Sequence, residues 1–333
     1  MSRIVQPSDL LKALGAETAP IGAETHVPLA VAPDGRRITL PVKLVLRPRR
    51  RLRRQLLIIT FSGSVDQSVR GFPHYPTGFA SAALIDDAVV LAIADPSLWL
   101  SPELRTGWYA ANQYADVPRA IGDLVAAVVS RLAPRRLIFV GNSNGAHGAL
   151  VQSARFPGCV CLALSPITRI SGFYPHRIQH YLSVCWDGAR SLEALPAEFV
   201  DDCGLLYREG HAHSLILLQN ATDPHLLRQA VPFAAQVRDR ERMLFLTHFY
   251  PDMLGHALPG KLRLEWVTAA ALAPTADCLD IARTHAEMFA ADQSGPAPER
   301  RAAEGRAAAP RASDRGARDL DLAARLAAAS LQK

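Results

Sequence analysis

The chain has 333 residues, of which 49% are hydrophobic, and it carries a formal net charge of +6 at pH 7. This length suits one large α/β domain or two small ones, and the apolar content is sufficient for a sizeable core. No apolar run reaches the length of a membrane span, and the first residues lack the long apolar segment of a signal peptide. We therefore expect a cytoplasmic protein.

The positive charge is concentrated in two segments. Six arginines lie between Arg47 and Arg54, and residues 294–333 carry a net charge of +3, so the rest of the chain is mildly acidic. This distribution argues against nucleic acid as a partner, because no basic face is spread over the fold. We interpret the arginine run as a solvated connection between strands, with peripheral contact to a membrane or another anionic surface as the alternative.

The five cysteines are odd in number and show no C-x-x-C spacing. We expect them to be reduced thiols that pack as small apolar side chains. The sequence also contains no dinucleotide-binding fingerprint, no P-loop and no His/Cys set with metal-ligand spacing, so we expect no cofactor and no metal. The cysteines are Cys159, Cys161, Cys185, Cys203 and Cys278.

The N-terminal part of the chain precedes the main domain. Residues 1–25 form an expected extension with a short helix from Ser8 to Leu14. A β-hairpin follows, with arms at 27–31 and 38–46, because Pro33-Asp34-Gly35 between them favours a turn.

Apolar runs typical of buried strands then alternate with helical patterns. Strands are expected at 55–61, 88–94, 137–140, 159–164, 214–220 and 242–248. Helices are expected at 116–132, 144–155, 226–238 and 260–272. This alternation predicts an α/β fold, with a mainly parallel sheet and helices on both faces.

Two segments depart from the alternation. Residues 167–213 are irregular and rich in aromatic residues, and an insertion of this length between core strands is expected to form a cap over a site. The α/β domain is expected to span residues 26–290. Residues 294–333 contain no aromatic residue and are rich in Ala, Arg, Pro and Gly, which predicts a disordered tail.

The pattern Gly141-Asn142-Ser143-Asn144-Gly145 follows one expected strand and begins an expected helix. This is the G-x-S-x-G nucleophile elbow, in which a strained turn presents the serine hydroxyl. Side chains at the two glycine positions would collide with the neighbouring strand and helix. The alternative is an ordinary glycine-rich turn in which Ser143 only caps the helix.

The carboxyl ends of parallel strands meet at one edge of a sheet. Asp223 follows the strand at 214–220, and His256 follows the strand at 242–248. Together with Ser143 they supply the groups that acyl transfer requires, because a serine hydroxyl needs a base to take its proton. The alternatives are that Asp223 is a helix N-cap and that His256 is a surface histidine.

Three further residues lie near these positions in the sequence. Asp252 is a weaker substitute for the acid. We place His225 outside the constellation, and we interpret His147 as a packing residue. We expect the oxyanion to be bound by the backbone N–H groups of Asn144 and of Ser62 or Gly63, which lie in a small-residue loop after the strand at 55–61.

The order of these groups along the chain resembles that of the α/β-hydrolase superfamily, over about residues 25–275. The resemblance implies that Ser143 is the nucleophile and that His256 acts as general base and then acid. It also implies that Asp223 orients the imidazole.

Aromatic loops around 72–79 and 108–114 are candidates for substrate binding, since flat rings suit sugar faces. We select His74 and Tyr75 from the first loop and Trp108 and Tyr109 from the second. For the second loop, packing of the loop itself is an equal alternative.

A narrower resemblance connects three segments to hydrolase-like proteins of bacterial surface-glycan and capsule assembly. These segments are Asp95-Pro96-Ser97, Gly107-Trp108-Tyr109 and Gln219-Asn220 with Asp223. This resemblance implies O-acyl transfer or deacylation on a glycan.

Three functions follow from the sequence. The first is a serine hydrolase that cleaves a small-molecule or glycan ester, or a thioester, through an acyl-enzyme on Ser143. The second is an O-acyltransferase or deacylase that acts on a surface glycan. The third is a hydrolase fold that serves as a non-catalytic scaffold.

Overall fold

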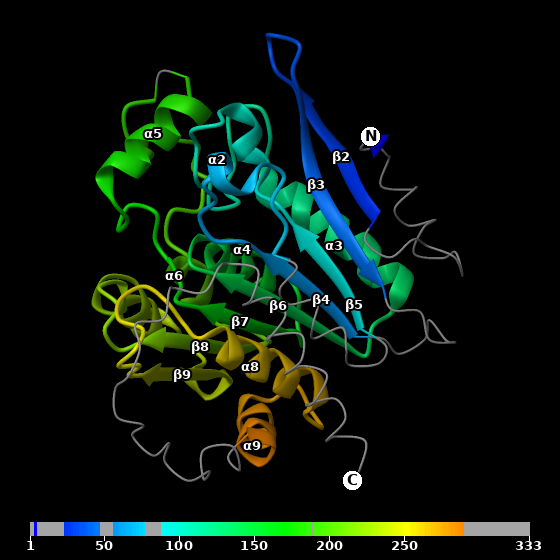
Figure 1. The fold of residues 1–333 in the computed structure, drawn as a ribbon, viewed down its shortest axis with the longest axis vertical. Coiled ribbons are helices and arrows are strands. Elements are labelled where there is room, and N and C mark those ends of the chain that lie inside the picture. Colours follow the sequence, from blue (N-terminus) through cyan, green and yellow to red (C-terminus); the bar gives the residue numbers. More distant parts are fainter. Residues whose placement is uncertain (1–2, 5–22, 47–55, 77–87, 188, 290–333) are drawn as a thin grey trace, which may run out of the picture.

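The computed structural model describes residues 3–4, 23–46, 56–76, 88–187 and 189–289 (Figure 1). The helix expected at Ser8–Leu14, the arginine run Arg47–Arg54 and the tail from residue 294 lie outside the described residues.

The described strands form one sheet, in the order β1-β2-β3-β5-β4-β6-β7-β8-β9. Neighbours from β5 to β9 are parallel, whereas β3 is antiparallel to both β2 and β5. The expectation of a mainly parallel sheet is therefore confirmed. The bounds are β1 Arg3–Ile4, β2 Ala23–Val31, β3 Arg37–Leu46, β4 Leu56–Phe61, β5 Ala88–Ile93, β6 Arg136–Asn142, β7 Val160–Leu164, β8 Ser214–Asn220 and β9 Met243–His248.

The antiparallel part of the sheet is the expected hairpin. Its first arm begins at Ala23, four residues before the expected start at Val27 and inside the segment expected to be an extension. The turn closes with hydrogen bonds between Ala32 and Arg36 and from the Gly35 N–H to the Ala32 carbonyl. Gly35 has a φ of +82°, a conformation that glycine adopts without the cost of a side chain.

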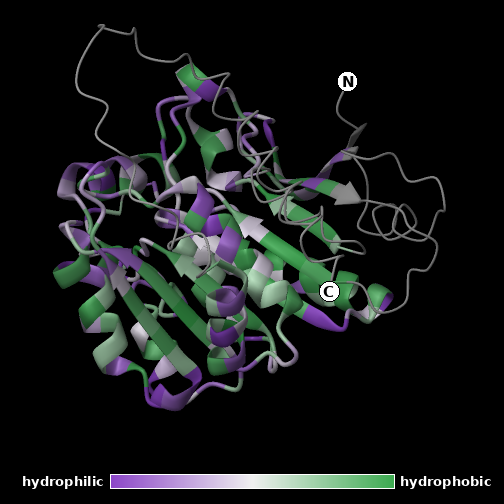
Figure 2. Cartoon of the chain, turned by 60° about the horizontal axis from the view of Figure 1, so that its bottom comes forward, coloured by the Kyte–Doolittle hydropathy of each residue, from purple (hydrophilic) through white to green (hydrophobic). Residues whose placement is uncertain are grey.

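Successive strand residues point to opposite faces of the sheet, and helices cover both faces. Leu57, Ile59 and Phe61 of β4 belong to one buried cluster, while Leu56 and Ile58 belong to another. Because both faces are covered, the central strands β4, β5 and β7 are buried at every position and almost entirely hydrophobic, and the strands in the middle of the sheet are mostly green in Figure 2. The first face is covered by α3 (Val117–Leu132), α4 (Asn144–Ser153), α6 (Gly204–Tyr207) and α7 (Val231–Gln236), and the second by α8 (Gly260–Leu272) and α9 (Cys278–Phe289).

Two helices differ from the sequence-based expectation. The helix expected at 226–238 begins as a π-helical turn, Leu226–Ala230, and continues as α7. Pro232 lies in the first turn of α7, where its missing N–H is tolerated. The helix α9 was not predicted, because its buried residues Cys278, Ile281 and Phe289 are too sparse to form a clear apolar period.

The insertion at 167–213 contains α5 (Pro175–Cys185), a 3-10 turn at Leu192–Ala194, and α6. In Figure 1, α5 lies at the upper left, beyond the arrowheads of the parallel strands. The indole ring of Trp108 holds it there through edge contacts, with ring centroids 5.4 Å from Tyr181 and 5.7 Å from Phe173. The insertion is therefore anchored by a hydrophobic cluster of its own.

All five cysteines are buried free thiols, as their small apolar character predicts. Within the ranges that the structure describes, none of the helices has both the length and the apolar content needed to cross a membrane.

Candidate active site

The turn between β6 and α4 has the geometry of a nucleophile elbow. Ser143 lies at its apex with φ +54° and ψ −119°, a conformation that non-glycine residues rarely adopt. A Cβ on Gly141 would overlap the Gly145 carbonyl, and a Cβ on Gly145 would overlap the carbonyls of Phe61 and Ser62. The two glycines thus allow the turn to lie close against both α4 and the end of β4.

Backbone hydrogen bonds hold the strained residue in place. The Ser143 N–H donates to the Leu164 carbonyl at 2.8 Å, at the end of β7. The Ser143 carbonyl accepts from the N–H groups of Ala146 and Ile167. The end of the neighbouring strand therefore fixes the position of the serine before any side-chain contact is made.

The structure brings Ser143, His256 and Asp223 together. The Nε2 atom of His256 lies 2.7 Å from the Ser143 Oγ, and its Nδ1 atom lies 2.6 Å from Asp223 Oδ2. The Asp223 side chain is fully buried, whereas 30% of the His256 side chain is exposed. The imidazole thus links a buried carboxylate to a hydroxyl at the surface of the site.

Asp223 is held as an ionised acceptor. Its Oδ1 accepts the His225 N–H at 2.8 Å, and its Oδ2 accepts the Gln219 amide at 2.6 Å in addition to His256. Burial alone would raise the pKa of Asp223, but the hydrogen bonds from His256 and His225 lower it below its ordinary value. Asp223 therefore does more than cap the following turn.

Two residues that the sequence analysis did not assign to the site position the His256 loop. The Asn220 amide donates to the carbonyls of Met253 at 2.6 Å and Ala257 at 3.1 Å, on either side of His256. The Thr222 hydroxyl accepts the Gly255 N–H at 2.9 Å and donates to the Asn220 side-chain oxygen at 2.9 Å. Asn220 is the last residue of β8, and Thr222 follows two residues later. Their position at the carboxyl end of a strand, where the site lies, could have indicated both from the sequence.

Of the three expected oxyanion donors, one is already used. The Ser62 N–H donates to the Tyr109 hydroxyl at 2.8 Å, so it is not available to a substrate. A Cβ on Gly63 would lie 3.2 Å from the Ser143 Cβ, which places the Gly63 backbone beside the serine. Asn144 begins α4 immediately after Ser143. Gly63 and Asn144 are therefore the remaining candidates for oxyanion donors. The expectation that the Ser62 N–H is a donor is wrong.

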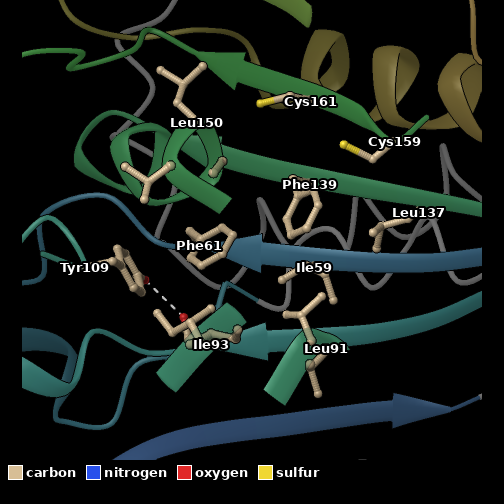
Figure 3. Close-up of a cluster of buried hydrophobic side chains, with 14 of the residues drawn as sticks. Ile59, Phe61, Leu91, Ile93, Tyr109, Leu137, Phe139, Leu150, Cys159 and Cys161 are labelled. Carbon is tan, nitrogen blue, oxygen red and sulfur yellow. Dashed lines mark hydrogen bonds between the residues drawn. The ribbon is translucent and has the colours of Figure 1, made fainter. Parts of the chain in front are cut away.

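The expectation that Tyr75, Trp108 and Tyr109 contact substrate is also corrected. Their exposed fractions are 8%, 0% and 3%, and none of them lines the cavity at Ser143. Tyr109 instead supports the site from inside, because its hydroxyl accepts from Ser62 and donates to the Ile93 carbonyl at 3.0 Å (Figure 3). Its ring packs edge-on against Phe61 in the core.

A buried carboxylate holds the Trp108–Tyr109 turn. Asp95 accepts the N–H groups of Gly107 at 2.7 Å and Tyr109 at 3.2 Å through one oxygen, and that of Ser97 at 3.1 Å through the other. Both Trp108 and Tyr109 have positive φ values. Burial raises the pKa of Asp95 to about 6, against the lowering effect of these donors.

A cavity of about 560 Å³ opens above the serine. His74, the remaining substrate-binding candidate, lies in its wall, and the insertion contributes residues at the start of α5. The lining residues are Ser62, Gly63, Ser64, Arg70, His74, Asn142, Ser143, Phe173, Tyr174, His176, Arg177, His225, His256 and Arg263.

The sequence analysis considered three further residues near the triad, His225, His147 and Asp252, and the structure places each of them differently. His225 lies beside His256, with ring centroids 4.9 Å apart, and its backbone rather than its ring contacts Asp223. His147 is 1% exposed, and burial lowers its pKa to about 4. Asp252 is exposed, and the carboxylate that contacts His256 is that of Asp223.

Within the described ranges, one group of side chains has the composition of a metal site. Ligand atoms of Asp223, His225 and His256 lie within 4.8 Å of one another. A cation bound by all three would compete for the Asp223–His256 hydrogen bond, and the two ring nitrogens of His256 already face Asp223 and Ser143. The hydrogen-bonded arrangement therefore fits proton transfer better than metal ligation.

No protein-family model matches the sequence, and no curated protein matches it significantly. Solved structures do show similar folds. A 2,6-dihydroxy-pseudo-oxynicotine hydrolase aligns with a TM-score of 0.51 at 15% identity, covering 81% of this chain and 73% of that chain. An S-formylglutathione hydrolase from Agrobacterium tumefaciens aligns with a TM-score of 0.48 at 15% identity, covering 75% and 90%.

The capsule O-acetyltransferase of Neisseria meningitidis serogroup A aligns with a TM-score of 0.49 at 12% identity, covering 68% of this chain and 91% of that chain. At identities this low, the similarities are informative about the fold alone. The order of the strands and the match to the pseudo-oxynicotine hydrolase identify the fold of this chain as the α/β-hydrolase fold.

Proposed function

We propose that this protein is a serine hydrolase that cleaves a carboxylic ester or thioester through an acyl-enzyme on Ser143. The observation that carries the proposal is the continuous hydrogen-bonded chain from the Ser143 Oγ through His256 to the buried carboxylate of Asp223, with distances of 2.7 and 2.6 Å. A hydroxyl becomes a useful nucleophile at neutral pH only when a positioned base takes its proton.

In the first half of the reaction, the Ser143 Oγ forms a bond to the acyl carbon while its proton moves to His256 Nε2. Asp223 stabilises the resulting imidazolium and fixes the ring through Nδ1. The negative charge on the carbonyl oxygen is met by the N–H groups of Asn144 and Gly63, and one such donor contributes roughly 3 kcal/mol. The bond to the leaving group then breaks as His256 returns the proton to it.

In the second half, His256 takes a proton from water, and the oxygen of that water attacks the acyl carbon. The bond between the acyl carbon and Ser143 Oγ breaks, and the proton passes from His256 back to Ser143. The products are a carboxylic acid and the regenerated enzyme, so one water is consumed for each ester cleaved.

A second candidate function is transfer of the acyl group to a hydroxyl of a glycan. The aromatic side chains of Phe173 and Tyr174 in the cavity wall, next to polar groups, favour this version because rings and hydrogen-bonding groups together suit a sugar. Incubation of the acylated protein with oligosaccharides and with water alone separates the two functions. Release of acid at the same rate with and without sugar would leave hydrolysis as the function.

A fluorophosphonate probe tests the proposal directly, because it reacts only with an activated serine. We expect a single adduct, which peptide mass spectrometry assigns to Ser143. Ser143→Ala should abolish the adduct, and His256→Ala should slow its formation by at least about 100-fold, since general-base catalysis contributes that much. An unlabelled but folded wild-type protein would contradict the proposal.

A further inference from the structure

The cavity above Ser143 has an unbalanced charge. Three arginines line it, Arg70, Arg177 and Arg263, and no aspartate or glutamate is among its described lining residues. They come from three separate parts of the chain, because Arg70 ends the short helix α2 (Gln67–Arg70), Arg177 lies in the first turn of α5, and Arg263 lies in α8. The convergence is therefore a property of the fold and not of one basic segment.

Two of these arginines lack an acidic partner in the described part of the chain. Arg177 is half-buried, and its side chain makes no hydrogen bond or ion pair with another described residue. The only described side-chain contact of Arg70 is with the His74 ring, at 3.3 Å. The chain pairs other arginines with carboxylates, as in Arg105 with Asp66.

Two of the histidines that line the cavity, His74 and His225, have lowered pKa values, which favours their neutral form. Burial, and then the charge of Arg70, lower the pKa of His74. Burial, and then His256, lower the pKa of His225. A guanidinium group is positively charged at neutral pH, so Arg70 and Arg177 give this part of the cavity a positive potential.

We propose that the substrate is an ester or thioester with an anionic group, a phosphate or a carboxylate, which Arg177 and Arg70 bind while its carbonyl lies at Ser143. This inference rests on the proposed hydrolase function and names its substrate class. Guanidinium groups bind phosphate and carboxylate through paired charge-assisted hydrogen bonds.

Because Arg177 lies in the insertion at 167–213, this segment would select substrates with an anionic group. Arg177 belongs to α5, whose position is set by the contact of Trp108 with Tyr181, whereas Ser143 belongs to the sheet edge. The anionic group lies away from the scissile carbonyl, because a second negative charge beside the developing oxyanion would oppose the reaction. The attraction should also weaken with added salt.

Direct binding tests the charged subsite without relying on catalysis. Calorimetric titration with pyrophosphate, and in a separate arm with succinate, measures the affinity of the wild-type protein for each kind of anion. We expect binding that Arg177→Gln and Arg70→Gln each weaken about ten-fold, the value of one charge-assisted contact. Arg131→Gln, an equal change of charge on the exposed side of α3, should bind as the wild type does.

A matched pair of substrates tests the same subsite during turnover. 4-Acetoxybenzoate and its neutral isostere 4-acetoxybenzamide differ in one charge, and we expect the wild type to favour the anion by about ten-fold in kcat/KM. Arg177→Gln should reduce this ratio towards one, while Arg131→Gln should keep it. Thermal unfolding of each variant verifies that it is folded.

The outcomes separate this inference from the function on which it rests. Anion binding that requires Arg177, in a protein whose Ser143 is never labelled by a fluorophosphonate, would keep the anion site and reject the hydrolase. Labelling of Ser143, with no anion binding and no preference for the charged ester, would keep the hydrolase and overturn the anion site. A preference that survives in both Arg177→Gln and Arg70→Gln would also overturn it.

Discussion

The hydrogen-bond donors around Asp223 determine which nitrogen of His256 carries a proton. The carboxylate has no proton to donate, so it accepts from His256 Nδ1 and leaves Nε2 free to accept the proton of Ser143. An asparagine at this position would offer an amide. Its oxygen would accept from the His225 N–H, and its NH₂ group would then face Nδ1 and favour the wrong tautomer.

We predict that Asp223→Asn lowers kcat by roughly 10³- to 10⁴-fold with little change in KM, because ester binding does not involve the carboxylate. Steady-state hydrolysis of a 4-nitrophenyl ester measures both constants. Asp252→Asn is the matched control, since it removes an exposed carboxylate of the His256 loop, and it should retain wild-type activity. Loss of activity in the control variant would make Asp252 the acid.

At the scale of the element, the end of β8 holds both the acid and the base. Asp223 contacts the His256 ring directly, while Asn220 and Thr222 bind the backbone on either side of that ring. The loop that carries His256 is therefore held in place by three residues at the carboxyl end of one strand. Loss of one of these hydrogen bonds should lower the rate of proton transfer more than the affinity for substrate.

We predict that Thr222→Val lowers kcat several-fold and leaves KM almost unchanged, because valine keeps the shape of threonine but leaves the Gly255 N–H without its acceptor. Thr222→Ser keeps the hydroxyl and should restore most of the rate. Hydrogen exchange of the Gly255 amide reports the same contact, and it should accelerate only in the valine variant. An equal loss in both variants would indicate a packing role instead.

Local patterns were sufficient to predict the elements that carry the chemistry. The strand before Ser143, the glycines beside it and the order of Asp223 and His256 all follow from short stretches of sequence. The roles of Tyr109 and Asn220 did not, because both depend on partners that fold next to them from distant segments. Likewise, the basic character of the cavity arises only when α2, α5 and α8 come together.

At the scale of the whole molecule, two buried carboxylates affect stability in opposite directions with pH. Hydrogen bonds lower the pKa of Asp223, so its contribution to stability is present above its unfolded value of 3.8 and is lost as the pH falls. Burial raises the pKa of Asp95 to about 6, so the native state prefers its protonated form. Its contribution is full below pH 3.8 and is lost as the pH rises through about 6.

We predict that Asp95→Asn flattens the pH dependence of stability between pH 4 and 6. Across this range the free energy of unfolding of the wild type should fall relative to the variant by roughly 2 kcal/mol, which is most of the roughly 3 kcal/mol that a shift of about two pKa units is worth in a fully buried group. Urea unfolding at several pH values measures the difference, in which the titration of other groups cancels.

The hydrogen bond that asparagine cannot accept from Ser97 adds a constant cost at every pH and leaves this slope unchanged. A difference that stays level from pH 4 to 6 would mean that the three backbone donors keep Asp95 ionised throughout, as a fixed anchor for the turn that holds Tyr109 against the Ser62 loop.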